Sequence, residues 1–184
     1  MLILAHAGIT LGIAELVERT RAKGGERPAA NPWWIDWRLA LVGSLLPDIV
    51  DKPVGQVLFR DTFSNGRIFC HTLLFLLVIA LVGAYLYRCQ KKTWLLILSF
   101  GTLVHLLLDQ MWLAPQTLLW PLYGFAFEKG DLSHWLENIL YALHTDPAVY
   151  MSELVGAGIL IWFALRLVQK KGVSAFIRNG NLFS

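Results

Sequence analysis

The stretch IFCHTLLFLLVIALVGAYLY, residues 68–87, contains no Asp, Glu, Lys or Arg. A helix of about 20 apolar residues crosses the hydrocarbon core of a bilayer, so this stretch predicts a transmembrane helix. Residues 93–108 are equally free of charge, and residues 149–168 carry only Glu153 and Arg166, each near one end. The sequence therefore predicts a membrane protein with at least three strongly apolar helices.

The overall composition agrees with this interpretation. Of the 184 residues, 56% are hydrophobic and only 16% are charged, whereas soluble domains carry about 25% charged residues. The mean hydropathy is +0.54 and the formal net charge is only +3. These values argue against a nucleic-acid-binding module, a disordered chain and a soluble enzyme. We expect an all-α integral membrane bundle that forms one domain over residues 1–184.

Two weaker apolar runs complete the expected bundle. Residues 39–59 contain Pro47 and several charges, and residues 1–14 are uncharged but short. The first run could be a cleaved signal peptide, but it lacks a basic start and a small-residue cleavage site, and it contains His6. We therefore favour a retained helix, which makes about five membrane-embedded helices in total.

The basic residues predict an orientation in the membrane. They cluster after the first run (19–27), between the third and fourth runs (88–92), and after the last run (170–178). Cytoplasmic segments of membrane proteins carry an excess of Lys and Arg. We therefore expect an inner-membrane protein with its N-terminus outside, a final transmembrane helix at 149–169 and a cytoplasmic tail at 170–184.

Two connecting segments have their own patterns. Residues 115–126 are apolar but contain two prolines and a glycine, which predicts a broken or interfacial stretch. Residues 131–143 repeat apolar side chains at helical spacing, which is typical of an amphipathic helix lying on the membrane. Cys70 and Cys89 are predicted near opposite ends of one helix, about 28 Å apart, too far for a disulfide.

Six ionisable residues lie within the apolar runs, where burial of charge is costly. With the orientation above, all of them fall in the outer half of the membrane. Because the basic clusters alone set that orientation, the common depth is a separate indication of one assembled site. The six residues are His6, Asp48, Asp51, His71, His105 and Asp109.

The spacing of these residues favours a metal site. His105 and Asp109 are four apart and share one face of a helix, and Asp48 and Asp51 are three apart. Imidazoles combined with carboxylates are ligands for Zn²⁺, Mn²⁺ or Fe²⁺, and six ligands are enough for one or two ions. Alternatively, the His–Asp pair is a polar contact between helices, and the two aspartates are solvated at a helix break.

Other polar residues allow two interpretations. Arg67, four residues before His71, is either a clamp for a phosphate oxygen or an interfacial anchor. His134, Glu137 and His144 lie on or beside the amphipathic segment, where we favour solvated surface positions.

Five short motifs occur in a recognisable order and resemble the YdjM-like family, described as LexA-binding, inner-membrane-associated, metal-dependent hydrolases. The resemblance covers about residues 1–125. The motifs are HAGITLG (6–12), GSLLPDIVDKP (43–53), RIFCHTLLF (67–75), GTLVHLLLDQMW (101–112) and LLWPLYG (118–124).

The resemblance implies a metal site built from the same six residues, and it implies hydrolase activity. The chain departs from the family pattern in two places. Thr72 stands where the family often has Ser, and Asp51 follows Asp48 by three residues where a spacing of two is common. The His-x-x-x-Asp element of His105 and Asp109 is also similar to part of the zinc-dependent phospholipase C pattern.

We therefore expect a membrane-bound hydrolase that holds one or two divalent ions, with zinc as the expected metal and manganese or iron as alternatives. It would cleave an ester or phosphoester of a lipid or other amphiphile at the outer leaflet. In this interpretation Asp51 is a bridging ligand or general base, and Arg67 binds a phosphate oxygen. Membrane lipid is the expected partner, and nucleic acid is not. The alternatives are a non-catalytic, metal-binding membrane regulator or scaffold, and a small ion transporter. A transporter would need polar groups through the full bilayer depth, which the nearly pure apolar inner halves of the strong runs disfavour.

Overall fold

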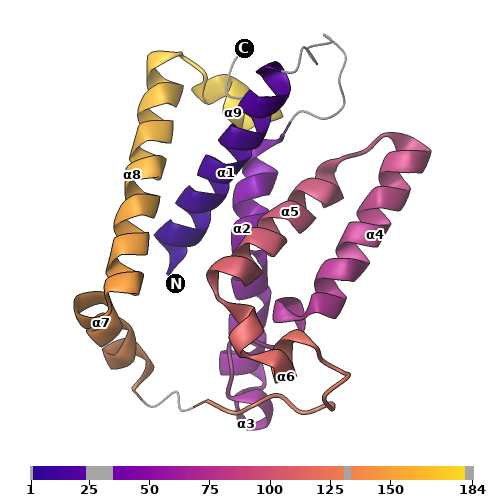
Figure 1. Cartoon of the computed structure of the whole chain (residues 1–184), viewed down its shortest axis with the longest axis vertical. Coiled ribbons are helices and arrows are strands. Elements are labelled where there is room, and N and C mark those ends of the chain that lie inside the picture. The colour runs from indigo at the N-terminus through magenta and orange to yellow at the C-terminus, as the bar shows by residue number, and fades with distance from the viewer. Residues whose placement is uncertain (1, 24–34, 131–133, 181–184) are drawn as a thin grey trace.

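The computed structural model describes residues 2–23, 35–130 and 134–180, and all regular structure in these ranges is helical (Figure 1). The elements are α1 (Ile3–Lys23), α2 (Trp37–Lys52), the π-helix η1 (Pro53–Leu58), α3 (Arg60–Phe63), the 3₁₀-helix η2 (Phe69–His71), α4 (Leu73–Gln90), α5 (Trp94–Leu108), the 3₁₀-helix η3 (Met111–Leu113), α6 (Pro115–Leu118), α7 (Trp135–Thr145), α8 (Pro147–Gln169) and α9 (Val173–Asn179). The prediction of an all-α fold is confirmed for the described residues.

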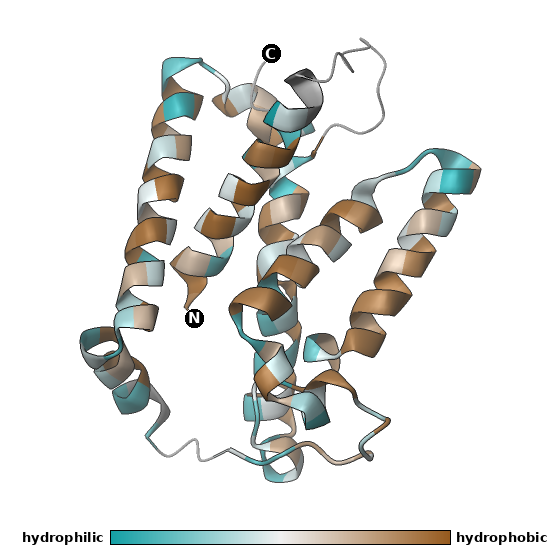
Figure 2. Ribbon diagram, viewed as in Figure 1, coloured by the Kyte–Doolittle hydropathy of each residue, from teal (hydrophilic) through white to brown (hydrophobic). Residues whose placement is uncertain are grey.

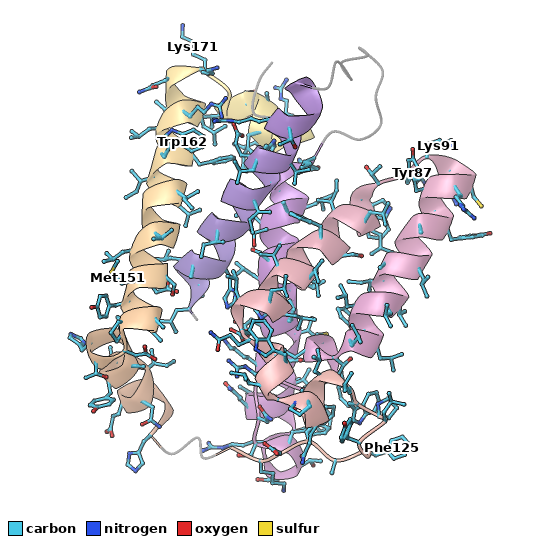
Figure 3. All side chains as sticks on the ribbon, in the orientation of Figure 1. Tyr87, Lys91, Phe125, Met151, Trp162 and Lys171 are labelled. Carbon is cyan, nitrogen blue, oxygen red and sulfur yellow. The ribbon has the colours of Figure 1, made fainter. Side chains whose placement is uncertain are left out.

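The five predicted runs form five helices that alternate in direction. Helices α1, α4 and α8 run toward one end of the molecule, and α2 and α5 run toward the other (Figure 1). The turn from α4 to α5 and the C-terminal end of α8 lie at the same end, and both are polar there (Figure 2). Lys91 and Lys171 mark this basic end, and Phe125 lies at the opposite end (Figure 3).

Two of these helices are long and apolar enough to cross a membrane, α4 and α8. Few of their residues are buried within the described chain. Leu81 of α4 and Ile161 of α8, for example, are 68% and 61% exposed. Helix α5 is apolar but has only 15 residues, about 22 Å of helix, which is shorter than the bilayer core. Helix α2 carries four charged residues: an arginine, two aspartates and a lysine. The predicted bundle of five spans is therefore not confirmed.

Helices α1 and α8 cross at a pair of glycines. A Cβ atom on Gly8 would overlap the carbonyl oxygen of Gly156, and a Cβ on Gly156 would overlap the carbonyl oxygen of Leu4. Only glycine permits such a close approach of two backbones. The crossing fixes the position of the first turns of α1 against the middle of α8.

Helices α2 and α5 cross in the same way. A Cβ on Gly101 would lie 2.6 Å from the carbonyl carbon of Gly43, and a Cβ on Gly43 would lie 2.6 Å from the carbonyl oxygen of Leu98. Thr102 lies beside the crossing, and its hydroxyl is 3.4 Å from the carbonyl oxygen of Gly43. This crossing brings the C-terminal half of α5 against the middle of α2.

The remaining segments cover the two ends of the bundle. The predicted broken stretch at 115–126 forms only the single turn of α6 and then irregular chain. Helix α7 begins at Trp135, and residues 131–133 of the predicted amphipathic helix lie outside the described residues. The predicted tail contains α9, which is docked: the amide of Trp37 donates to the carbonyl of Gly180 over 3.0 Å.

Candidate metal centre

The six predicted ligands come together from four parts of the chain. The first turn of α1 supplies His6, η2 supplies His71, and α2 supplies two aspartates. The last turn of α5 supplies His105, and Asp109 is its C-cap residue. The three histidines are fully buried. Segments more than 100 residues apart in sequence therefore share one polar cluster inside an otherwise apolar bundle.

The arrangement of His71 and His105 is the most informative feature of the cluster. Their Nε2 atoms lie only 3.2 Å apart. The Nδ1 atom of His71 lies 2.7 Å from Oδ2 of Asp51, and the Nδ1 atom of His105 lies 2.7 Å from the Ser44 carbonyl oxygen. Both of these oxygens only accept hydrogen bonds, so both Nδ1 atoms carry hydrogen.

In the neutral form, the two Nε2 atoms therefore point lone pairs at each other. Two facing lone pairs repel unless a cation lies between them or one ring takes up a proton. Two nitrogen atoms bound to one tetrahedral zinc lie about 3.3 Å apart, given zinc–nitrogen bonds of about 2.05 Å. The spacing and the tautomers of His71 and His105 thus fit a shared divalent ion.

Asp48 joins these two histidines. Its Oδ1 atom lies 3.6 Å from Nε2 of His71 and 3.9 Å from Nε2 of His105. Its second oxygen, Oδ2, accepts a hydrogen bond from Nζ of Lys52 over 2.6 Å. Asp48 therefore presents one oxygen to the histidine pair and the other to a cation on its own helix.

His6 and Asp109 form the second half of the cluster. Nε2 of His6 lies 3.1 Å from Oδ1 of Asp109, and Nη2 of Arg67 lies 2.9 Å from Oδ2 of the same carboxylate. The ring of His6 stacks on that of His105 with centroids 4.1 Å apart. The Nδ1 atom of His6 is buried and has no hydrogen-bond partner among the described residues.

Asp51 lies behind His71 rather than facing the other ligands. Its carboxylate accepts hydrogen bonds from the backbone amides of Ile68, Cys70 and His71, in addition to the Nδ1 hydrogen of His71. A carboxylate in this position sets the orientation and tautomer of a ligating histidine. The predicted role of Asp51 as a bridging ligand or general base stays a prediction; the contacts in the structure are those of a residue that orients His71.

The backbone before α4 explains how His71 reaches the cluster. Residues 69–71 form a tight 3₁₀ turn, and Arg67 lies outside any helix. Arg67 and His71 are thus not one α-helical turn apart, although both reach the cluster. Thr72 begins α4 as its N-cap, with Oγ1 accepting from the amide of Phe75 over 3.0 Å. A serine hydroxyl would cap the helix equally well, so Thr72 preserves this part of the family pattern.

Two groups of possible ligand atoms emerge from this geometry, and both include His105. One contains His6 and Asp109, and the other contains Asp48 and His71; within each group the ligand atoms lie within 4.8 Å of one another. Because Nδ1 of His105 is held by the Ser44 carbonyl, only its Nε2 atom can bind metal. His105 can therefore serve one ion at a time.

The other polar candidates do not join the cluster. His134, Glu137 and His144 are all exposed. Nδ1 of His134 pairs with Oε2 of Glu137 over 3.0 Å, and Nδ1 of His144 lies 2.8 Å from the Leu140 carbonyl oxygen. These contacts lie within or next to α7 and supply nothing to the buried groups.

Sequence reasoning missed three residues that support the cluster. Lys52 neutralises Asp48, and its spacing of four residues within one helix could have revealed the pair. Ser44 acts through its backbone carbonyl, which no side-chain pattern reports. Glu153 was noted only as a charge near one end of the last apolar run, and it lies near the start of α8. Its carboxylate accepts hydrogen bonds from three amides at the start of α1, just before His6: Leu2, Leu4 and Ala5.

Comparison with known proteins places this chain in a family. Residues 1–173 match the family described as YdjM inner membrane protein. The chain belongs to this family. The match confirms the resemblance and extends it beyond residue 125, so that α7 and α8 are part of the family architecture as well. The family description and the two apolar spans also support a membrane location. No curated protein and no solved structure matches the chain.

Proposed function

We propose that this member of the YdjM family is a membrane-bound, metal-dependent hydrolase that cleaves an ester or phosphoester bond of a lipid or other amphiphile. The facing imidazoles of His71 and His105 carry the proposal, because their 3.2 Å separation and fixed tautomers suit a divalent cation. The Nδ1 atom of His6 is buried and has no hydrogen-bond partner among the described residues, which is a further sign that the cluster is not a closed structural network.

The ligands divide into three residues that would hold one ion and two residues that would add to the site. His71, His105 and Asp48 would hold the first ion, which leaves an open position of the kind that catalytic zinc sites have. His6 and Asp109 would complete the coordination of that ion or contribute to a second one. A divalent ion held there supplies Lewis acidity that polarises the scissile group and lowers the pKa of water toward about 7.

The protein's own residues account for the other requirements of hydrolysis. Asp48 and Asp109 each present one oxygen to the cluster, so the one that does not bind metal can accept a proton from water. Asp51 keeps His71 in position, and Arg67 offers a guanidinium for charge that develops on the substrate. The buried histidines lie where bulk water is excluded, which strengthens all of these interactions.

The location of the cluster favours an amphiphilic substrate. Exposed apolar side chains lie close to it in sequence, including Phe69, Trp112 and Leu113. The three basic clusters defined above follow the first run, separate the third and fourth runs, and follow the last run. Their described residues lie at one end of the bundle, so the positive-inside rule would put the opposite end outside. With that orientation the N-terminus is outside, the C-terminus is cytoplasmic, and the substrate comes from the outer leaflet.

Metal content is the first test. The detergent-purified protein should hold about one or two divalent ions per chain, with zinc expected first and manganese or iron as alternatives. His105→Ala should lose the metal, because His105 belongs to both groups. His134→Ala, which removes an exposed histidine, is the matched control and should keep it. Full occupancy in a His71→Ala, His105→Ala double variant would refute the ligand assignment.

Hydrolysis is the second test. The metal-loaded protein is offered a phosphoester and an uncharged carboxylic ester that carry the same acyl chains. Turnover that depends on His105 supports the hydrolase. If the wild-type protein holds metal in full but cleaves neither substrate, a non-catalytic metal-binding regulator becomes the better interpretation.

A further inference from the structure

Each of the two carboxylates that face the histidines divides its oxygens between the buried cluster and a surface cation. Asp48 directs Oδ1 toward His71 and Oδ2 toward Lys52. Asp109 directs Oδ1 toward His6, and its Oδ2 lies 2.9 Å from Nη2 of Arg67 and 4.0 Å from Nε2 of His71. A carboxylate–cation pair therefore occurs on both sides of the cluster: Asp48 and Lys52 lie in the same helix, α2, whereas Asp109 at the end of α5 pairs with Arg67 from the segment before η2.

The two cations are the solvent-facing members of this arrangement. The side chains of Lys52 and Arg67 are 40% and 46% exposed, whereas those of Asp48 and Asp109 are 13% and 5% exposed. The backbone next to Arg67 also lies close to the stem of Lys52: a Cβ on Gly66, the residue before Arg67, would lie 3.1 Å from Cγ of Lys52. A molecule that approaches the cluster past these residues meets two positive charges first.

The charge of the cluster depends on the metal. With neutral histidines, the side chains of the three aspartates, Lys52 and Arg67 together carry a net charge of −1. One divalent ion changes this to +1. The ion also attracts the carboxylates of Asp48 and Asp109, and this attraction weakens their ion pairs with Lys52 and Arg67.

We propose that Lys52 and Arg67 form an anion subsite that becomes available when metal binds, and that this subsite takes a phosphate group. The inference rests on the proposed function and names the class of its substrate. A guanidinium donates two parallel hydrogen bonds to phosphate oxygens, and an ammonium adds a point charge. These two donors with one metal ion match the three terminal oxygens of a phosphate. Metal and phosphate then strengthen each other's binding, because such a coupling is reciprocal.

The wild-type protein provides the first measurement. Inorganic phosphate, a short-chain phosphatidic acid and a diacylglycerol with the same chains are titrated into detergent-solubilised protein with and without zinc. Phosphate and phosphatidic acid should bind at least 10-fold tighter with zinc, and diacylglycerol should show no such change. Equal phosphate binding with and without zinc would overturn the proposal. Tighter binding of the lipid than of inorganic phosphate identifies a headgroup as the ligand, and equal binding identifies free phosphate.

Lys52→Met provides the second measurement, since it keeps the length of the side chain and removes the charge. Phosphate affinity should fall about 10-fold, whereas zinc affinity should rise severalfold because Asp48 loses a competing cation. Lys52→Arg should restore phosphate affinity. Lys129→Met is the matched control, because Lys129 is an exposed lysine whose described hydrogen bond goes to a backbone carbonyl outside the cluster; it should change neither affinity.

The two affinities separate a subsite from a structural role. A fall in zinc affinity in Lys52→Met would mean that Lys52 merely holds Asp48 in place, and unchanged phosphate affinity would mean that no subsite exists. Either result overturns the inference without refuting the proposed hydrolase function, which the wild-type turnover assay tests separately. Conversely, the protein could bind phosphate in a way that depends on zinc and on Lys52, yet hydrolyse no ester. That result would support the subsite and refute the proposed hydrolase function.

Discussion

The two glycine crossings of the bundle hold their histidines in different ways. At the α2–α5 crossing, Gly43 and Gly101 allow the helices to touch, and His105 lies one turn beyond Gly101. Its Nδ1 atom donates directly to the carbonyl of Ser44, the residue after Gly43. The same crossing that joins the helices therefore also fixes the ring of His105.

At the α1–α8 crossing, the helix is fixed but the ring is not. Gly8 and Gly156 bring the backbones together, and Glu153 binds the first amides of α1. The ring of His6, however, contacts Asp109 and His105, which belong to the other helix pair. The α2–α5 pair thus supplies four of the six residues, η2 supplies His71, and the α1–α8 pair adds only His6.

The largest effect is expected when the α2–α5 crossing is opened. Gly101→Ala places a methyl group 2.6 Å from backbone atoms of Gly43 and Ser44, and backbone cannot move aside as a flexible side chain can. Such overpacking costs about 1–3 kcal/mol or more. Because His105 belongs to both ligand groups, zinc binding should be lost almost completely. Metal analysis and thermal unfolding in detergent measure the two effects, and a variant that retains zinc would show that the crossing does not position His105.

A smaller effect is expected at the α1–α8 crossing. Gly156→Ala should displace α1 and lower the zinc affinity only as far as His6→Ala does. The zinc affinity of a variant with both substitutions should be no lower than that of either single variant. Gly158→Ala is the matched control two residues away, since a Cβ there would meet no atom of the described residues within 4 Å. It should stabilise the helix by up to about 1 kcal/mol. Complete loss of zinc in Gly156→Ala would mean that the two crossings do not act separately.

The sequence predicted the helices and the cluster well because both depend on local, strongly biased patterns. An uncharged run of 20 residues leaves few alternatives to a membrane helix, and an ionisable group inside such a run needs a partner. The six residues that this reasoning selected do converge. The role of Asp51 was not predicted, because it depends on the 3₁₀ turn that aims three backbone amides at its carboxylate.

The crossings themselves could not be predicted from the sequence. Gly8, Gly43, Gly101 and Gly156 look like ordinary helix glycines, and nothing local indicates which pairs will meet. Glu153 shows the same limit, since its partners lie about 150 residues away. Contacts of this kind arise only when the chain has packed, and sequence periodicity reports only which face of a helix is apolar.

Glu153 allows a further test of whether the α1–α8 and α2–α5 pairs behave separately, because it binds the backbone of α1 and not the ring of His6. Glu153→Gln keeps an oxygen acceptor but loses the charge, whereas hydrogen bonds to a charged group contribute about 1.5–3 kcal/mol. We expect amide hydrogen exchange at Leu2, Leu4 and Ala5 to accelerate about 10-fold or more, and Glu153→Ala to have a larger effect. Exchange in α5 should stay unchanged; acceleration there would show that the two helix pairs unfold as one unit.

The smallest effect is expected where α9 joins the two pairs at the basic end. Asp36 caps α2 by accepting from the amides of Arg38 and Leu39, and its carboxylate pairs with the Arg38 guanidinium. The same guanidinium donates to the carbonyls of Ile177 and Arg178 in α9. Phe176 of α9 in turn packs on Phe163 of α8. Asp36 thus stabilises a junction that belongs to both pairs.

Asp36 should make this junction sensitive to acid. Burial raises the pKa of Asp36, but the hydrogen bonds and charge of Arg38 and the hydrogen bonds from the capped amides lower it by more, so the pKa lies below its ordinary value of 3.8. A depressed pKa stabilises the folded state fully above the unfolded-state pKa, and this stabilisation is lost as the pH falls through the folded-state value.

Asp36→Asn keeps the cap and should cost little at pH 7, whereas Asp36→Ala should cost about 1 kcal/mol. Amide exchange at Trp37, which donates to Gly180, measures the junction directly. The exchange rates of wild type and Asp36→Asn should converge only once the pH has fallen below the folded-state pKa of Asp36, which itself lies below 3.8. A difference that persists there would mean that the amide group of Asn, and not the missing charge, perturbs the junction.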